Sequence, residues 1–235
     1  MPTRFRDTFG DRKVVLPVIH VEGVEQALRN TLLAREAGAD GVFLIGHDLD
    51  WSDMLVVYQM AHKEHPDWFL GINLLDLKAR RAMQFMGTYA VDALWADNAR
   101  IEEWEEHQVY AKSVHHEREE WKGLYFGGVA FKHQLPVDNV AVAAKKAVPY
   151  MDVVTTSGPA TGQAASVEKL RAMKEAIGDH PLAVASGVTV ENVGEILPFV
   201  DAILVATGIS KSFTELDAGK TKALVERVHL EPGSR

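Results

Sequence analysis

The sequence contains no cysteine, and its charge is biased toward one sign. Without cysteine there can be no disulfide, no thiolate metal site and no cysteine nucleophile, and such a composition suits a reducing compartment. The chain has 33 acidic against 25 basic residues, a formal net charge of −8. Because surfaces that bind phosphate backbones are usually basic, we expect no nucleic acid partner.

Long apolar runs and Gly/Ser/Pro-rich linkers are also absent. No run approaches the roughly 20 residues that a membrane-spanning helix needs. The polar start, MPTRFRDTFGDRK, lacks the apolar segment of a secretory signal. We therefore expect a soluble, cytoplasmic protein with no membrane span. Its 235 residues are expected to form one domain, with residues 1–12 as an N-terminal extension and residues 229–235 as a C-terminal tail.

Eight short apolar runs recur along the chain, separated by segments with helical periodicity. Most of the runs are continuous rather than alternating, which is typical of parallel strands covered on both faces. In one intervening segment, Leu170, Met173 and Ile177 fall on one helical face at i, i+3 and i+7. The apolar runs cover residues 14–20, 41–47, 69–75, 91–97, 124–132, 152–158, 182–188 and 202–208.

An aspartate precedes the apolar centre of four of these runs, at Asp40, Asp92, Asp152 and Asp201. We interpret each as closing a helix-to-strand turn, although aspartate is common in turns generally. Eight strand-helix units in a chain near the usual 250 residues predict an α/β fold, a closed (β/α)8 barrel. An open doubly wound sheet is the alternative, but no G-x-G-x-x-G follows the first run.

In such a barrel the chemistry lies at the carboxyl ends of the strands, so the polar residues that end each run are the candidates. A lysine there can hold an anion, act as an acid, or form a Schiff base if burial lowers its pKa. Burial can also raise a carboxylate pKa toward neutrality. The alternatives are a snorkelling lysine, aspartates that cap helices and histidines bonded within the fold. The candidate catalytic residues are His20, His47, Asp48, Asp97 and Lys132.

The last two runs each close on a glycine beside a hydroxyl side chain, at Gly187 and Gly208. Glycine lets a backbone N–H approach an anion, and the start of the next helix adds unpaired N–H groups. The loops after the seventh and eighth strands of these barrels often bind phosphate. The alternative is that the glycines only permit tight turns and that Thr189 caps a helix. The candidate phosphate and substrate ligands are Asn73, Thr156, Ser157, Gly158, Ser186, Gly187, Val188, Thr189, Thr207, Gly208, Ile209, Ser210 and Lys211.

No metal or cofactor is expected. A site made of His20, His47 and Asp48 is chemically possible, but it lacks the local spacing of a zinc or iron motif. The stretch HHEREEW, which starts at His115, follows the acidic IEEWEEH and is typical of a solvated helix face.

Several stretches together resemble the BtpA/SgcQ family: GINLL, GGVAFKHQLP, DVVTTSGPATG, ASGVTVENV and ATGISK. The resemblance covers most of the chain. It implies a (β/α)8 barrel related at a distance to phosphate-binding barrels such as phosphoribosylanthranilate isomerase. The family's motifs match this sequence at positions that the resemblance implies are site residues. These are Lys132 with His133, residues 156–162, residues 186–193, and Thr207 with Lys211. The family is linked by name to photosystem I assembly and is often labelled an isomerase. The resemblance therefore implies no particular reaction for this chain.

The sequence departs from that family's pattern in three places. HVEGVEQAL follows the first run where the family usually has a Pro-rich loop. The second run ends LIGHD, with Gly46 and His47 in place of a Glu-Asn pair. Ala206 stands where a glycine is usual. These departures predict a divergent member with a more open substrate end.

Two functions follow from these observations. The first is an enzyme that acts on a small phosphorylated sugar or ribonucleotide-like metabolite by isomerisation, lyase chemistry or group transfer, including transfer of phosphoribosyl type. The second is a non-catalytic assembly or scaffold protein, for which Trp51, Trp104 and Trp121 are candidate contact residues. The alternative is that these tryptophans pack against neighbouring helices or lie in a homo-oligomer interface.

Overall fold

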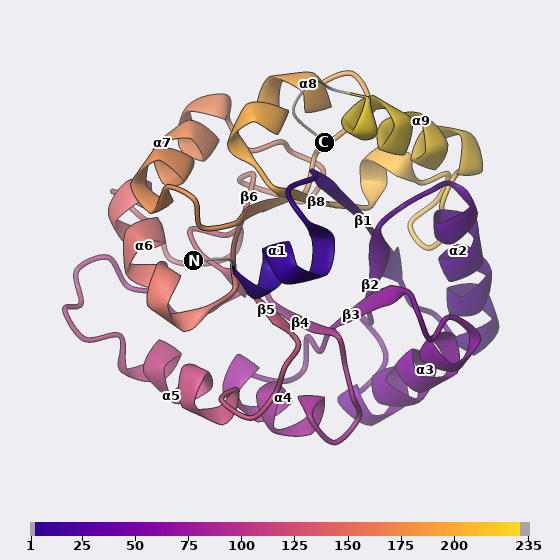
Figure 1. Ribbon diagram of the computed structural model, residues 1–235, viewed down its shortest axis with the longest axis horizontal. Helices are drawn as coiled ribbons and strands as arrows, with labels where there is room; N and C mark the ends of the chain where they lie inside the picture. The colour runs from indigo at the N-terminus through magenta and orange to yellow at the C-terminus, as the bar shows by residue number, and fades with distance from the viewer. Residues whose placement is uncertain (1–2, 231–235) are drawn as a thin grey trace.

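A computed structural model describes residues 3–230 and forms a closed barrel of eight parallel strands in sequence order. Strand β8 closes the ring by pairing with β1, with Val14 opposite Ala202 and Pro17 opposite Val205. Helices surround the strands (Figure 1). The predicted (β/α)8 barrel is therefore confirmed. Each of the eight apolar runs contains one of the strands. Within the described residues, no helix combines the length and hydrophobicity needed to cross a membrane.

The strands are β1 (Val14–His20), β2 (Gly41–Ile45), β3 (Phe69–Asn73), β4 (Ala93–Ala96), β5 (Leu124–Gly128), β6 (Val153–Ser157), β7 (Leu182–Ala185) and β8 (Ala202–Val205). The outer helices are α2 (Val24–Glu36), α3 (Trp51–Glu64), α4 (Ala79–Met86), α5 (Val109–Glu117), α6 (Val140–Ala147), α7 (Val167–Ile177), α8 (Val193–Ile196) and α9 (Ala218–His229). Short 3-10 turns are η1 (Val148–Tyr150), η2 (Leu197–Phe199) and η3 (Thr207–Ile209). Side chains of Asp50, Ser166 and Asp217 cap the N-termini of α3, α7 and α9, as expected for short polar residues before an amphipathic run.

The barrel interior is filled by aromatic and aliphatic side chains rather than left as a pore. Phe43 lies 5.1 Å from Phe126 and 5.8 Å from Trp95, ring centre to ring centre, in edge-to-face arrangements. Such contacts add to the free energy gained by burying apolar area. A second apolar layer lies between strands and outer helices.

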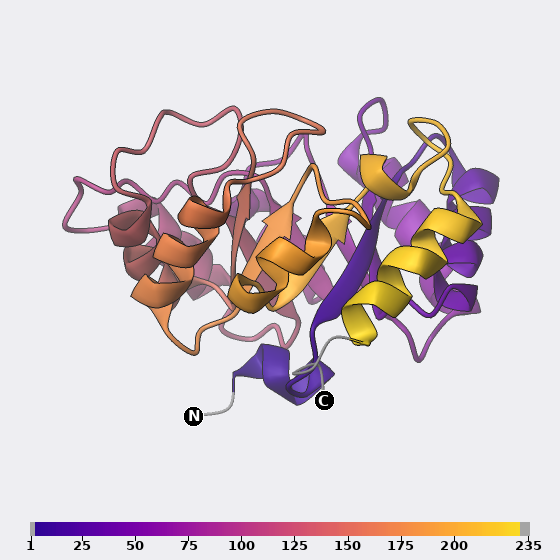
Figure 2. The same cartoon turned by 90° about the horizontal axis from the view of Figure 1, so that it is seen from above.

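A short helix, α1 (Arg4–Phe9), lies across the amino-terminal end of the barrel (Figures 1 and 2). Its Phe5 packs 6.5 Å from Phe126, and its Phe9 packs 4.8 Å from Phe69. The segment expected to be an N-terminal extension therefore covers the bottom of the barrel, and the opposite end is left for loops. At the other terminus α9 continues to His229, and residues 231–235 of the predicted tail lie outside the described residues.

Four aspartates stand where an even-numbered strand begins, and each accepts a hydrogen bond from the strand before it. The N–H groups of Val15, Leu70, Tyr125 and Leu182 donate to Oδ2 of Asp40, Asp92, Asp152 and Asp201, respectively, over 2.8, 3.0, 2.8 and 2.9 Å. For Asp40, Asp152 and Asp201, the backbone N–H of the aspartate also donates to the carbonyl of its partner residue on the preceding strand. We call these four the aspartate clamps, and they add an inter-strand bond to the turn role predicted from the sequence.

The clamps differ in how the buried charge is compensated. Asp152 pairs with the buried guanidinium of Arg118, and Asp201 pairs with Lys174 at 2.7 Å. Asp40 pairs with Arg12 at 3.0 Å. Asp92 forms no ion pair within residues 3–230, and burial raises the pKa of its carboxyl group.

We expect opposite effects from neutralising two of these clamps. Asp152→Asn should lower the free energy of unfolding by about 3–5 kcal/mol, because it leaves the Arg118 charge buried without a partner. Asp92→Asn keeps an acceptor for Leu70 N–H and removes only an uncompensated charge. Urea denaturation at pH 7 should find it as stable as the wild type or more stable.

The pH dependence of the stability difference between Asp92→Asn and the wild type tests whether the charge of Asp92 is the cause. Because the folded-state pKa of Asp92 lies above its ordinary value of 3.8, its stabilising contribution is lost as pH rises through the folded-state pKa. The advantage of Asp92→Asn should therefore vanish at pH values below 3.8. A large loss of stability for Asp92→Asn at pH 7 would contradict this account.

Candidate active site at the barrel mouth

A cavity of about 310 Å³ lies at the carboxyl ends of the strands. It is bounded by polar side chains on one side and by aromatic and apolar side chains on the other. Six residues predicted from the sequence as site residues line it: His20, His47, Asp97, Lys132, Ser186 and Thr207. The structure thus brings together side chains from five different strand ends and the loop after β8.

Lys132 crosses the mouth from the loop after β5 toward the loops after β6 and β7. Its Nζ donates to Thr161 Oγ1 at 3.1 Å and to Ser186 Oγ at 3.2 Å, and its backbone N–H donates to Ser157 Oγ at 2.8 Å. Within the described part of the chain, no carboxylate pairs with this ammonium group. Lys132 is half-buried, and the hydrogen-bond partners of its ammonium group are neutral hydroxyls.

The backbone around this lysine adopts a conformation that L-residues rarely use. Ala130, His133 and Ser186 have φ angles of 48°, 64° and 74°. Each such residue costs free energy relative to ordinary backbone, and such costs concentrate at functional sites. The two side chains that meet at 3.2 Å, Lys132 and Ser186, therefore both belong to segments held in place by the surrounding fold.

Two further side chains brace the loop that carries Lys132. The ammonium group of Lys169 on α7 donates to the carbonyls of Ala130 at 2.6 Å and Ser157 at 2.8 Å. Burial lowers the pKa of Lys169 to about 8. Gln134 donates to the carbonyls of Asp97 at 2.6 Å and Gly128 at 3.1 Å. The loop is thus tied to both neighbouring strands. Sequence reasoning missed Lys169, because a lysine in an amphipathic helix ordinarily points to solvent.

Asp97 supplies a carboxylate to the cavity wall next to Lys132. Its Oδ1 accepts a hydrogen bond from Asn73 Nδ2 at 2.9 Å. Burial raises the pKa of Asp97, while Asn73 and the nearby charges of Lys132 and His133 act in the opposite direction. Asn73 is 2% exposed and does not line the cavity. Its contact with Asp97 makes it a positioning residue in this structure.

His20 and His47 form a bonded pair on the opposite side of the cavity. His20 Nδ1 lies 3.0 Å from His47 Nε2, a distance at which one imidazole donates to the other. Burial, reinforced by His47 and Lys132, lowers the pKa of His20 to about 4. His47 is exposed, so the pair connects the cavity with the solvent. Phe213, from the loop after β8, lies over both rings at 4.2 Å and 5.4 Å.

Other predicted site residues lie away from this cavity. Asp48 is exposed and is not part of the cavity wall, and the neighbouring Asp50 caps α3. Thr156 and Ser157 are buried, with their hydroxyls bonded to backbone groups of residues 130, 132 and 158. The remaining predicted residues that do not line the cavity are Gly158, Gly187, Val188, Thr189, Gly208, Ile209, Ser210 and Lys211.

Gly187 and Gly208 bring the backbones of neighbouring loops into contact. A Cβ on Gly208 would lie 1.9 Å from the carbonyl oxygen of Val188, and one on Gly187 would lie 2.2 Å from the backbone nitrogen of Ala164. Gly187 also has a φ of 68°. Protein backbone therefore fills the space between the loops after β7 and β8. Any anion bound by these loops would lie on their cavity side.

Some of the amides predicted to cradle an anion are already bonded within the protein. The N–H of Thr189 donates to Asn192 Oδ1 at 2.9 Å, and the N–H of Ile209 donates to the Ala206 carbonyl at 3.0 Å. The N–H groups of Gly187, Val188 and Gly208 donate to no acceptor in the described part of the chain. These three amides of the predicted cradle have no partner within the described fold, and none of the three residues lines the cavity.

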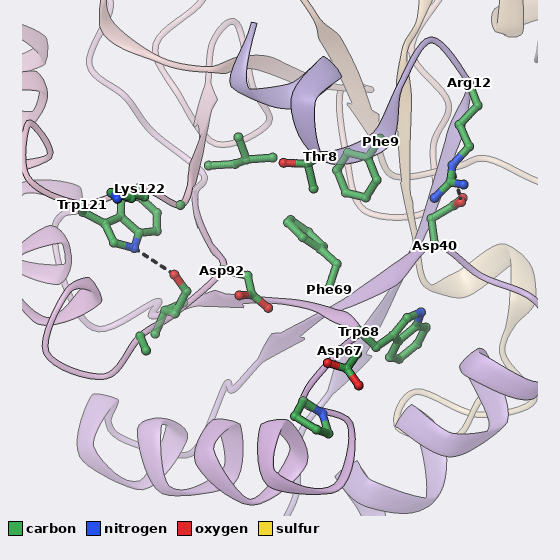
Figure 3. A pocket seen from close by; sticks show the side chains of 15 residues that line it. Thr8, Phe9, Arg12, Asp40, Asp67, Trp68, Phe69, Asp92, Trp121 and Lys122 are labelled. Carbon is green, nitrogen blue, oxygen red and sulfur yellow. Dashed lines mark hydrogen bonds and ion pairs between the residues drawn. The ribbon is translucent and has the colours of Figure 1, made fainter.

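A larger hollow, of about 650 Å³, lies at the amino-terminal end of the barrel beside α1 (Figure 3). Several of its polar groups are engaged in holding the fold. Asp40 pairs with Arg12, Trp121 Nε1 donates to the Val91 carbonyl at 2.8 Å, and Asp92 is one of the aspartate clamps. The mouth, where Lys132 is uncompensated, is therefore the better candidate for chemistry. The described residues contain no group of three or more potential metal ligands.

A family model described as the BtpA family matches residues 106–230. The chain belongs to the BtpA family. This match includes Lys132, Ser186 and Thr207, whereas His20, His47 and Asp97 precede it. Comparison with the curated proteins gives no match.

Solved structures with a similar fold include three enzymes of low sequence identity. Phosphoribosyl anthranilate isomerase from Thermus thermophilus has a TM-score of 0.64 at 16% identity, over 91% of this chain and 97% of that chain. Orotidine 5'-monophosphate decarboxylase from Methanocaldococcus jannaschii has a TM-score of 0.70 at 14% identity, over 92% and 98%. The tryptophan synthase alpha subunit from Legionella pneumophila has a TM-score of 0.69 at 12% identity, over 97% and 99%. At these identities the likeness concerns the fold alone.

The histidine pair gives a pH-dependent prediction. In an NMR titration of the imidazole groups, His20 should stay neutral well below its ordinary pKa of 6.5 and titrate with a midpoint of about 4. Because the folded-state pKa is lowered, the stabilising contribution of His20 is present above pH 6.5 and is lost as pH falls through 4. His20→Gln should therefore lose less stability than the wild type over this interval. A midpoint near 6.5 would refute the assigned environment.

Proposed function

We propose that this BtpA family member is an enzyme acting on a small phosphorylated metabolite, either a sugar phosphate or a ribonucleotide-like compound. The phosphate binds at Lys132 and at the loops after β7 and β8, where Ser186 and Thr207 face the cavity. One observation carries the proposal. The ammonium group of Lys132 lies at the cavity wall, where its hydrogen-bond partners are two hydroxyls and no carboxylate of residues 3–230 forms an ion pair with it.

An anion at this position would complete the contacts of Lys132. A lysine ammonium has three N–H groups, and two are directed to Thr161 and Ser186. A phosphate oxygen would accept the third and could also accept from the hydroxyl groups, which act as donors or acceptors by rotation. Thr207, from the loop after β8, adds a further hydroxyl at the cavity wall. Charge-assisted bonds of this kind are stronger than those between neutral groups.

Proton transfer is the chemistry that the remaining cavity residues support. Asp97, whose pKa is raised by burial, is suited to act as an acid or base nearer neutrality than an ordinary aspartate. His20 is neutral near pH 7 because its pKa is about 4, and it can pass a proton through His47 to solvent. Such a set serves isomerisation, lyase chemistry or group transfer, with Lys132 holding the substrate or acting as an acid.

The names of structurally similar proteins support a phosphorylated substrate. Phosphoribosyl anthranilate isomerase, orotidine 5'-monophosphate decarboxylase and 3-hexulose-6-phosphate synthase each carry a phosphorylated compound in their names. Because identity is 16% or less, this support concerns the class of ligand and not the reaction.

The scaffold function has less support from the tryptophans that suggested it. Trp51 stacks on Phe85 with ring centres 4.4 Å apart, and Trp121 is 6% exposed. Trp104 is 59% exposed, and a single exposed ring is ordinary for a soluble surface. The concentration of polar groups at the mouth favours the enzyme.

Replacing the uncompensated lysine tests the proposal. Lys132→Met should weaken the binding of ribose 5-phosphate, measured by isothermal titration calorimetry, by about 10- to 100-fold, because a charge-assisted hydrogen bond and its charge are lost. The fold should be retained, since Lys132 forms no ion pair with any of residues 3–230. Lys145→Met, on the exposed surface of α6, is the matched control and should bind as the wild type does. Equal affinity of all three proteins would refute the proposal.

A further inference from the structure

The mouth cavity is divided into two chemically different halves. Residues after β5, β6, β7 and β8 supply an ammonium group and three hydroxyls: Lys132, Thr161, Ser186 and Thr207. The other half is formed by the loop after β8 and by the ends of β1, β2 and β3, and it consists of rings and carbon: His20, His47, Leu75 and Phe213. The proposed phosphate occupies only the first half, so the second half bears on what the phosphate is attached to.

Phe213 is the most informative residue of the second half, because it is held at the rim without being buried. It is 63% exposed, which is unfavourable for a large aromatic ring in water. The backbone on both sides of it is fixed. Ser210 and Leu216 form an isolated antiparallel bridge, and the N–H of Leu216 donates to Asn30 Oδ1 at 2.8 Å. Folding of the barrel does not require an exposed ring at this position.

Buried amide side chains from α2 complete the anchoring of this loop. Asn30, which is fully buried, donates to the Thr214 carbonyl at 3.3 Å. Gln26 also donates to the Thr214 carbonyl, and Arg29 pairs with Glu215. Burying polar groups is costly unless they are hydrogen-bonded, and here several of them serve to hold one loop. Phe213 directly precedes Thr214, so these bonds hold the backbone next to its ring.

The rings around Phe213 present flat faces, and one nitrogen of each imidazole is already engaged in the His20–His47 contact. The His20 and His47 rings are inclined by 15°, and Phe213 lies 4.2 Å from the His20 ring centre. Leu75, 39% exposed, adds apolar surface. The hydroxyls of an open-chain sugar would lose water here with few partners in return. A planar ring would lose few hydrogen bonds to water and would gain stacking contacts.

We propose that the ligand carries a planar unsaturated ring, as a nucleoside 5'-monophosphate does, which packs against Phe213 and its neighbours while the phosphate binds at Lys132. This rests on the proposed function and selects the ribonucleotide-like class over sugar phosphates. The cavity of about 310 Å³ lies at the lower end for small-molecule sites. It therefore suits one nucleotide and not a dinucleotide.

Calorimetric titration of the full chain with AMP, UMP and ribose 5-phosphate tests this directly. At least one of the two nucleotides should bind about tenfold or more tightly than ribose 5-phosphate. Phe213→Ala should weaken nucleotide binding by about tenfold, the order found when a stacking ring is removed. The same substitution should leave the affinity for ribose 5-phosphate unchanged. Phe213→Tyr should bind nucleotide as the wild type does.

A matched control and separate readouts keep the outcomes distinct. Val109→Ala removes another exposed apolar side chain, 75% exposed at the start of α5, and should change neither affinity. Binding of ribose 5-phosphate as tightly as both nucleotides, or equal loss of both ligand types in Phe213→Ala, would overturn the ring proposal while leaving the phosphate site standing. Failure of all three compounds to bind would overturn the proposed function itself, and the ring proposal with it.

Discussion

The architecture depends on four aspartate side chains whose oxygens accept hydrogen bonds and so join the strands in pairs at the amino-terminal end of the barrel. Each of the four clamps fixes one odd-numbered strand against the even-numbered strand that follows it, and three of them also bring in a cation. With the lower end fixed in this way and closed by α1, the upper strand ends have defined positions. The mouth can then carry uncompensated charge and unusual backbone angles, because the stability of the fold is supplied elsewhere.

The mouth is organised around a cation that forms no ion pair with a carboxylate of residues 3–230. In a chain with a net charge of −8, the ammonium group of Lys132 faces hydroxyls, while its loop is braced by Lys169 and Gln134. Desolvation acts on its surroundings as well, because it raises the pKa of Asp97 and lowers that of His20. An ammonium group with hydroxyl partners, a carboxylate, a histidine pair and an exposed aromatic ring therefore meet in one cavity.

Much of this could be predicted from the sequence, because it depends on local patterns. The continuous apolar runs predicted the strands, and the polar residues that end those runs, such as His20 and Lys132, predicted the mouth. The clamps could be predicted only as turns, because the partner of each carboxylate is 19 to 27 residues away. Phe213 could not be predicted, because its position is set by Asn30, 183 residues earlier in the chain. The close approach at Gly208 likewise depends on how two loops meet, which no single segment encodes.

The central claim is that Lys132 and the loops after β7 and β8 hold a phosphate group. X-ray diffraction from crystals grown with a nucleoside 5'-monophosphate tests it most directly. The account predicts tetrahedral density in the mouth, with oxygens at hydrogen-bond distance, about 2.7–3.2 Å, from Lys132 Nζ and Ser186 Oγ. An empty mouth at saturating ligand, or a phosphate bound elsewhere on the molecule, would contradict it.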